Sequence, residues 1–436
     1  MKKFNLINYI LPSVVSMVIV GTYTNIDGLF IGNRAGDDGL AAINIAWPIV
    51  AFITSLGTGL GIGSSVMVNV LRGGNKYGIA EKAKFIAMRL FIIGGLISTV
   101  ICLLSYSPLL WLLGAKGKVR TYAENYSLII SLGAIFQVVG SGAVVLLRNE
   151  GKTYSALAYT AVGLIVHIGL DILTVKKFEL YGVAMATVVS QAVVAAMSVY
   201  TVLRSRNNGF PKEKTEQNYC DGTTKITLKI LKHSIAPFGL NFVPSATLLF
   251  TNYFAMKIGG TAAVGAYAVM SYAVYTYDYI FQGVCDGVQP LLSYYRGAND
   301  SCEEVKTVRK TAIILMTLSV LFVALTPVVI ILLPKIFAVS AEAESLMKAG
   351  LVTYAFAYPL KAAVKFISSH AYSTGKVAVS NVVTYLDPFL FTPLSLALLS
   401  SKGIEGIWIA LPVSQALTIL VAIVIYLALK NRPKSA

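Results

Sequence analysis

The chain alternates long apolar runs with short polar segments. Twelve runs are long enough for an α-helix to cross the hydrocarbon core of a bilayer, which takes about 20 residues. Because backbone polar groups inside lipid must pair with one another, we expect each run to be a transmembrane helix. The predicted spans are residues 5–31, 39–70, 85–113, 122–147, 153–175, 182–203, 231–256, 262–295, 311–333, 345–372, 377–400 and 404–429.

The twelve spans fall into two groups of six with an internal repeat. When the sequence is placed against itself at an offset of 224 residues, several segments match without a gap. The pairs are RGGN from Arg72 with RGAN from Arg296, GK at Gly151 with GK at Gly375, and GVAMATVVSQ from Gly182 with GIWIALPVSQ from Gly406. We predict two pseudo-symmetric six-helix bundles: an N-lobe of residues 1–203, a cytoplasmic linker of residues 204–230 and a C-lobe of residues 231–436. Parallel repeats of this kind occur in secondary transporters.

Composition and charge support a membrane protein. Hydrophobic residues make up 56% of the chain and charged residues 13%, against about 25% charged residues in soluble domains. Basic residues favour the cytoplasmic side, and with both termini inside, 23 of the 36 lysines and arginines fall in cytoplasmic loops and 10 in outside loops. The net charge of +16 therefore reflects topology, and because no basic patch forms, we expect no nucleic-acid partner.

Several segments carry a resemblance to a known family. They are DGLFIG from Asp27, LLRNEGK from Leu146, GLDILTV from Gly169, GVAMATVVSQ from Gly182 and GVQPLLSYYRGA from Gly287. In this order and spacing the sequence resembles the multidrug and toxic compound extrusion (MATE) family, most closely its bacterial MepA-like branch. The resemblance implies a V-shaped, all-α fold and export of organic cations or amphipathic drugs driven by protons or sodium. It also implies a monomer in the bacterial inner membrane, embedded in lipid.

The resemblance also implies a cation site in the N-lobe. Carried over to this chain, its residues are Asp27, Tyr23, His167, Asp171 and Thr187, and Pro12 matches a proline that bends the first helix. The family has an asparagine where this chain has His167. Because imidazole is a poor sodium ligand, we expect protons as the coupling ion, with a weak sodium site at Asp27 and Asp171 left open. No other metal and no cofactor are expected.

Residue type and spacing alone also indicate a functional site at these positions, independently of the family resemblance. An ionisable residue inside a span is a functional candidate by default. Tyr23 and Asp27 are four residues apart, as are His167 and Asp171, so each pair shares a helix face. Two neighbouring buried carboxylates favour uptake of a proton by one of them, and histidine exchanges protons at about pH 6.5. The alternative is a structural hydrogen-bond network between spans 1 and 5.

The second half contains different polar residues within its spans. We predict a substrate cavity lined by Tyr275, Asp278, Tyr279, Asp286, Lys361, Lys365 and Asp387. Lysines this deep are expected to pair with a carboxylate or to face water, so a purely structural ion pair is the alternative. The tyrosines can contact flat cations by cation–π interaction, although aromatic residues in spans also serve as packing and interface anchors.

Two other functions compete with drug export. One is a flippase or exporter of lipid-linked sugars or other metabolites from the wider superfamily that shares this plan. The other is a membrane-embedded enzyme that modifies lipids, which requires catalytic groups clustered near one interface. The buried acids lie well within the spans and the chain has no Walker motif, so we expect an ion-coupled secondary transporter and not an enzyme.

Overall fold

The protein is described by a computed structural model over residues 5–205, 222–337 and 341–430, apart from the side chains of residues 24, 25, 33, 37, 429 and 430. Within these residues nearly every position is helical and no β-strand occurs, so the predicted all-α class is confirmed. Most of the predicted linker, residues 206–221, lies outside the described residues.

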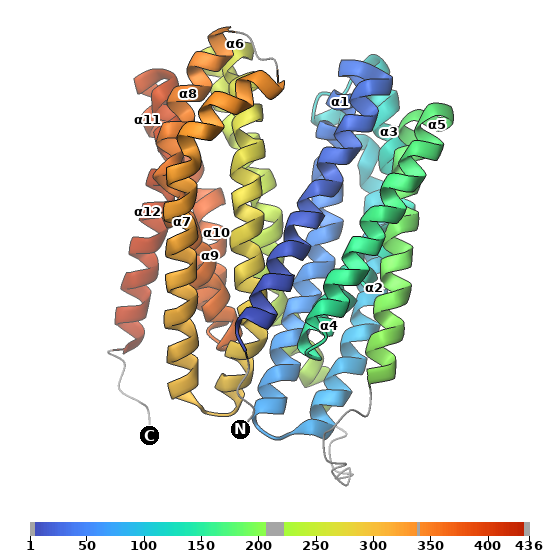
Figure 1. Ribbon diagram of the computed structural model, residues 1–436, viewed down its shortest axis with the longest axis vertical. Coiled ribbons are helices and arrows are strands. Elements are labelled where there is room, and N and C mark those ends of the chain that lie inside the picture. Colours follow the sequence, from blue (N-terminus) through green and yellow to red (C-terminus); the bar gives the residue numbers. More distant parts are fainter. Residues whose placement is uncertain (1–4, 206–221, 338–340, 431–436) are drawn as a thin grey trace. The chain divides into compact units, whose positions relative to one another are not determined.

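Except between α5 and α6, the helices follow one another with short connections (Figure 1). Their bounds are α1 Ile7–Gly73, α2 Tyr77–Leu112, α3 Gly117–Leu132, α4 Ala134–Asn149, α5 Thr153–Arg204, α6 Gly222–Gly297, α7 Ser301–Phe337, α8 Ala341–Ala355, α9 Ala357–Ser373, α10 Val377–Leu386, α11 Thr392–Leu399 and α12 Gly403–Lys430. A π-helical turn at Asp387–Phe391 joins α10 to α11, and a 3₁₀ turn at Ser400–Lys402 precedes α12.

Three of the long helices contain sharp breaks that divide them into separate spans. The 76 residues of α6 would form a straight rod of about 114 Å, far longer than a hydrocarbon core of about 30 Å. The breaks lie at Gly36 in α1, Glu179 in α5 and Gly260 in α6. The bent pair α3 and α4, at 56°, is together long and apolar enough for one further span. With these divisions the helices agree with the twelve-span plan.

The breaks lie at positions that the internal repeat relates to each other. Gly36 (φ 60°, ψ −149°) and Gly260 (φ 62°, ψ −156°) have nearly the same backbone conformation and are separated by the offset of 224 residues. Glu179 (φ 47°, ψ −126°) and Gly403 (φ 69°, ψ −152°) form a second pair at that offset. Because a positive φ is rare away from glycine, its recurrence at paired positions supports a duplication.

The chain divides into two compact units, which are described separately. Unit 1 contains Met1–Phe242 and Gly287–Ser301, and unit 2 contains Val243–Asp286 and Cys302–Ala436. In unit 1, α1, α4 and α5 pack on one another, and α2 packs on α1 and α4. In unit 2, α12 packs against α8, α9, α10 and α11. The lobe boundaries drawn from the sequence stay a prediction.

Small residues allow the helices of unit 1 to approach closely. A Cβ atom on Gly57 would lie 2.8 Å from the Cα of Val138, and one on Gly61 would lie 3.0 Å from the Cα of Gly142. The segment GTGLGIGSS, residues 57–65, is therefore a helix-packing surface of the kind common between membrane helices.

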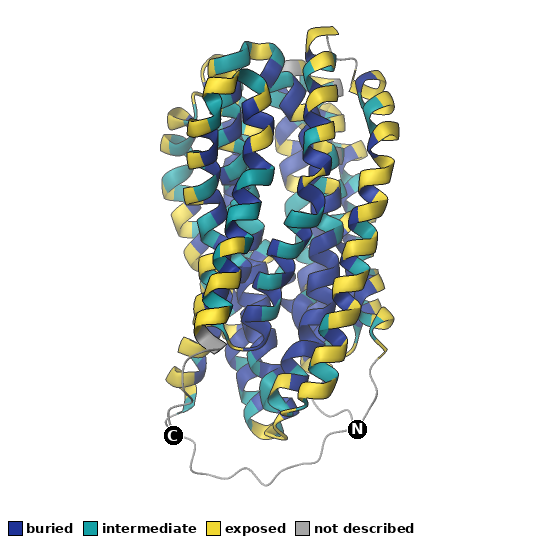
Figure 2. Cartoon of the chain, turned by 90° about the vertical axis from the view of Figure 1, so that its left-hand side faces the viewer, coloured by how far each residue is buried: buried dark blue, intermediate teal, exposed yellow. Residues whose placement is uncertain are grey.

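The outer faces of the helices are apolar. On α2 the exposed side chains Ile93, Ile97, Val100 and Leu104 recur at helical spacing, and Leu104 is 76% exposed. Figure 2 shows exposed residues along the outer faces of the helices and buried residues facing inward. Such stripes suit contact with lipid chains, because water would make a large exposed apolar surface unfavourable.

Candidate functional site

A buried group of three ionisable side chains lies between α1 and α5 in unit 1. His167 and Asp171 are one turn apart on α5, and Asp27 comes from the first part of α1. The Nε2 atom of His167 lies 3.0 Å from Oδ1 of Asp27 and 3.5 Å from Oδ2 of Asp171. All three residues are buried. The two predicted pairs thus meet in a single cluster, which we call the N-site: Asp27, His167 and Asp171.

A single nitrogen atom, Nε2 of His167, lies close to three polar side chains of the site. His167 Nε2 also lies 3.2 Å from Oγ1 of Thr187. A neutral imidazole carries one N–H, so it cannot donate to Asp27, Asp171 and Thr187 together. The position of that hydrogen must depend on which carboxylate is charged.

A tyrosine that the sequence patterns do not reveal completes the N-site. The hydroxyl of Tyr126, on α3, donates to Oδ2 of Asp27 at 3.3 Å. Tyr126 stands in the segment AENYSLII, where no motif marks it as a partner of Asp27. Only tertiary packing brings it to Asp27.

Tyr23 approaches the N-site through its ring and not through its hydroxyl. Its ring stacks on that of His167, with centroids 4.9 Å apart and an interplanar angle of 25°. The hydroxyl donates to the backbone oxygen of Thr160 at 3.5 Å. Gly163 leaves the space for this ring, because a Cβ there would lie 2.6 Å from the Tyr23 hydroxyl oxygen. Tyr23 therefore fixes the plane of the imidazole.

Pro12 interrupts the hydrogen bonds at the start of α1. Proline has no N–H, so it leaves the carbonyl four residues earlier without its helical donor. That carbonyl belongs to Asn8, and it accepts a hydrogen bond of 2.8 Å from the hydroxyl of Thr153 on α5. A side chain of α5 thus stabilises α1 at the position where it bends most easily. The role of Pro12 in bending remains a prediction.

A second ionic cluster lies in unit 2, between α6 and α9. Asp278 forms two ion pairs, one between Oδ1 and Nζ of Lys361 at 3.1 Å and one between Oδ2 and Nζ of Lys365 at 3.0 Å. Lys365 also donates to Oε1 of Gln282 at 3.0 Å, and Nε2 of Gln282 donates to Oδ1 of Asp286 at 2.8 Å. Asp278, Gln282 and Asp286 form one stripe on α6 because they are four residues apart. Four of the predicted cavity residues are therefore linked.

The other predicted cavity residues of unit 2 have different partners. Asp387 begins the π-helical turn and accepts Nε2 of Gln415 at 3.4 Å. The hydroxyl of Tyr275 donates to the backbone oxygen of Pro244 at 3.4 Å, and Tyr279 is half-buried. Because π-helical turns often occur at functional sites, Asp387 stays a candidate for the predicted substrate cavity.

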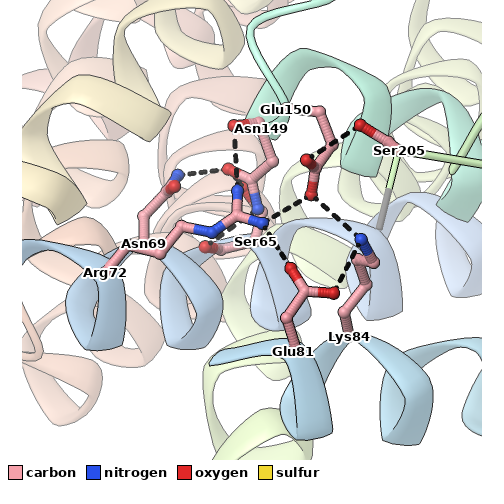
Figure 3. Close-up of polar contacts among 8 residues, drawn as sticks. All are labelled: Ser65, Asn69, Arg72, Glu81, Lys84, Asn149, Glu150 and Ser205. Atoms are coloured by element: carbon pink, nitrogen blue, oxygen red, sulfur yellow. Dashed lines mark hydrogen bonds and ion pairs between the residues drawn. The ribbon is translucent and has the colours of Figure 1, made fainter. Parts of the chain in front are cut away.

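A third buried network, which the sequence patterns do not predict, joins four helices at one end of unit 1 (Figure 3). Arg72 of α1 contacts Oε1 of Glu150 at 2.7 Å and Glu81 of α2 at 3.1 Å. Lys84 contacts the same two carboxylates at 3.5 Å and 3.0 Å, and the hydroxyl of Ser205 donates to Oε2 of Glu150 at 3.2 Å. Asn149 is connected to Ser65 and Asn69. Asn149 and Glu150 of the LLRNEGK segment thus hold the end of α4 against α1 and α2.

We expect Glu150→Gln to destabilise the protein more than Glu81→Gln. Glu150 is 6% exposed and Glu81 is 30% exposed, and removing one partner from a buried ionic group costs about 3–5 kcal/mol. Solvent reduces the corresponding loss at Glu81. Thermal unfolding of the purified protein in detergent measures both. Equal shifts in Tm for the two variants would show that the greater burial of Glu150 does not increase the loss of stability when its charge is removed.

Comparison with known proteins places the N-site in a recognised domain. The MatE family model matches residues 12–173, which contain Asp27, His167 and Asp171. Matches to relatives extend over nearly the whole chain. The multidrug export protein MepA of Staphylococcus saprophyticus is 22% identical, and the alignment covers 98% of this chain and 94% of that protein. The chain is thus similar to MATE transporters, over residues 12–173 by the family model and over nearly its whole length by these relatives.

MATE transporters of known structure share the fold. An outward-facing multidrug resistance MATE transporter of the MOP superfamily superimposes with a TM-score of 0.86 at 20% identity, covering 98% of this chain and 96% of that one. A MOP superfamily transporter from Pyrococcus furiosus, described as having a binding pocket of reversed polarity, gives the same TM-score, identity and coverage.

These matches confirm the predicted resemblance to the MATE family and the MATE-like fold. They also confirm a membrane transporter rather than an enzyme, which removes the lipid-modifying alternative. The roles assigned to individual residues, the coupling ion and the substrate remain predictions.

Proposed function

We propose that the protein is a secondary active multidrug exporter that expels organic cations or amphipathic small molecules in exchange for protons. The observation that carries the proposal is the position of His167 Nε2, which lies within 3.5 Å of both Asp27 and Asp171 in a buried site. A single added proton changes the hydrogen bonding of all three side chains there. The relatives named as multidrug exporters support the substrate class.

Protonation of Asp27 would loosen the connection between α1 and α5. A neutral carboxyl group no longer attracts the Nε2–H of His167 as strongly, since hydrogen bonds to charged groups are worth roughly twice those between neutral groups. The imidazole is then free to turn its N–H towards Asp171, 3.5 Å away. Pro12 and the side-chain bond from Thr153 to Asn8 make the start of α1 the segment where this change can bend the helix.

Sodium fits the N-site less well than a proton. Sodium prefers an all-oxygen shell, whereas the atom that reaches both carboxylates is the Nε2 nitrogen of His167. Asp27, Asp171 and the Thr187 hydroxyl supply oxygen atoms, so a weak sodium site is the competing proposal.

In unit 2 we assign substrate binding to Asp278 and its neighbours. Two ammonium groups, Lys361 and Lys365, share this one carboxylate. A cationic substrate would compete with a lysine for Asp278, while Tyr275 and Tyr279 offer aromatic faces. Asp286 and Asp387 supply further negative charge to compensate a bound cation.

The family resemblance and the distribution of charges support a proposal for the membrane setting. We place the protein as a monomer in the bacterial inner membrane, surrounded by lipid and with both termini in the cytoplasm. The excess of basic residues in the loops on that side supports this orientation.

Imposed ion gradients test the proposal. In proteoliposomes we expect a pH gradient at equal sodium to drive ethidium accumulation, and a sodium gradient at equal pH to leave it near the level of protein-free liposomes. Accumulation driven by sodium alone, with no response to the pH gradient, would replace the proton with sodium. Accumulation under neither gradient would remove secondary drug transport itself.

A further inference from the structure

The N-site also has the geometry of a transition-metal site. One atom from each of Asp27, His167 and Asp171 can be chosen so that all three lie within 4.8 Å of one another. The separations from His167 Nε2 are 3.0 Å and 3.5 Å. In a tetrahedral site with bonds of about 2.0–2.2 Å, neighbouring ligand atoms lie about 3.3–3.6 Å apart. Small side-chain adjustments therefore suffice to enclose an ion.

The donors are those that a divalent transition metal prefers. One imidazole nitrogen with carboxylate oxygens is a common ligand set for Zn²⁺ and its neighbours in the series. The hydroxyl of Thr187, 3.2 Å from Nε2, or a water molecule can fill a fourth position. We propose that Asp27, His167 and Asp171 bind a divalent transition-metal ion such as Zn²⁺.

Such an ion would prevent protonation of the N-site and hold α1 and α5 together there. It requires the free Nε2 lone pair and charged carboxylates, so it excludes the proton held between the same groups. By joining Asp27 of α1 to His167 and Asp171 of α5, it fixes the two helices together. This consequence for transport rests on the proposed coupling function, whereas metal binding itself does not.

The affinity should be below that of structural zinc sites. Metal-bound histidines usually donate their other N–H to a protein acceptor, which orients the ring and strengthens the bond. The Nδ1 atom of His167 is buried and has no hydrogen-bond partner among the described residues. Stacking on Tyr23 orients the ring but does not strengthen the ligand.

Cobalt absorption tests the site directly in the purified full-length protein. We expect Co²⁺ to give the intense visible bands of four-coordinate cobalt and Zn²⁺ to remove them. His167→Asn should weaken Co²⁺ binding by at least about 100-fold, since even loss of an outer-shell partner costs about 10–100-fold. The double variant His233→Asn/His370→Asn, which removes the other two histidines, should bind Co²⁺ as the unaltered protein does.

A second measurement, of Tm with and without Zn²⁺, separates loss of metal binding from misfolding of His167→Asn. Zn²⁺ should raise the Tm of the unaltered protein and of the double variant, but not that of His167→Asn. Bands that persist in His167→Asn, or that vanish in the double variant, would overturn the proposal and place the metal elsewhere. Absence of four-coordinate bands in the unaltered protein would also overturn it, and proton-driven ethidium accumulation would still stand.

Discussion

Asp27→Asn should reduce proton-driven ethidium accumulation in proteoliposomes by at least about 30-fold. The amide cannot exchange the proton, and it replaces the carboxylate whose Oδ1 lies 3.0 Å from His167 Nε2. A hydrogen bond to a charged group contributes about 1.5–3 kcal/mol, and about 2 kcal/mol corresponds to about 30-fold in rate. Asparagine nearly matches aspartate in size, so Tyr126 can still donate to the remaining oxygen and folding should be retained.

Asp38→Asn is the matched control for this variant. Asp38 belongs to the same helix, α1, but it is exposed and lies beyond the break at Gly36. Its substitution should leave the rate within about twofold of the unaltered protein, because exposed charges contribute little. Equal losses in Asp27→Asn and Asp38→Asn would argue for a general effect of charge and against a coupling role for Asp27.

The second large effect is expected in stability. Asp278→Asn would leave Lys361 and Lys365 without the carboxylate that they share at 3.1 Å and 3.0 Å. Uncompensated charge from a broken buried pair costs about 3–5 kcal/mol. We therefore expect a clear fall in Tm in detergent, larger than for any single lysine substitution, because removing one lysine leaves a balanced pair.

Rescue distinguishes this explanation from simple loss of packing. The triple variant Asp278→Asn/Lys361→Met/Lys365→Met removes both charges along with their partner, and apolar replacement of a buried ionic group is often neutral or stabilising. Its Tm should return most of the way to that of the unaltered protein. A triple variant less stable than Asp278→Asn would show that the lysines have stabilising partners other than Asp278.

The helical plan was predictable because membrane insertion imposes strong rules on sequence. Each span needs a long apolar run, and these runs are visible without alignment. The repeat was equally visible, and its offset coincides with the breaks at Gly36 and Gly260. The sharpness of the break between neighbouring spans, as at Gly36 in α1, was not visible, because a short polar connection looks the same in the sequence whether it is a single kinked residue or a loop.

The candidate site was predictable where side chains lie one turn apart. His167 and Asp171 share a helix face by spacing alone, and the family motif added Asp27. Tyr126 and the network of Arg72, Glu81, Lys84 and Glu150 carry no comparable local signal. Apart from the pair Glu81 and Lys84 within α2, their partners come from other parts of the chain, and only packing decides which of these parts meet.

The most direct test of a proton site at Asp27 is the pH inside proteoliposomes when substrate is added outside. With an enclosed pH dye and sodium kept equal on both sides, ethidium entry through an antiporter must expel protons. The unaltered protein should make the interior more alkaline, and Asp27→Asn should give only the signal of protein-free liposomes. An equal pH change with Asp27→Asn, or ethidium entry through the unaltered protein with no pH change, would contradict the account.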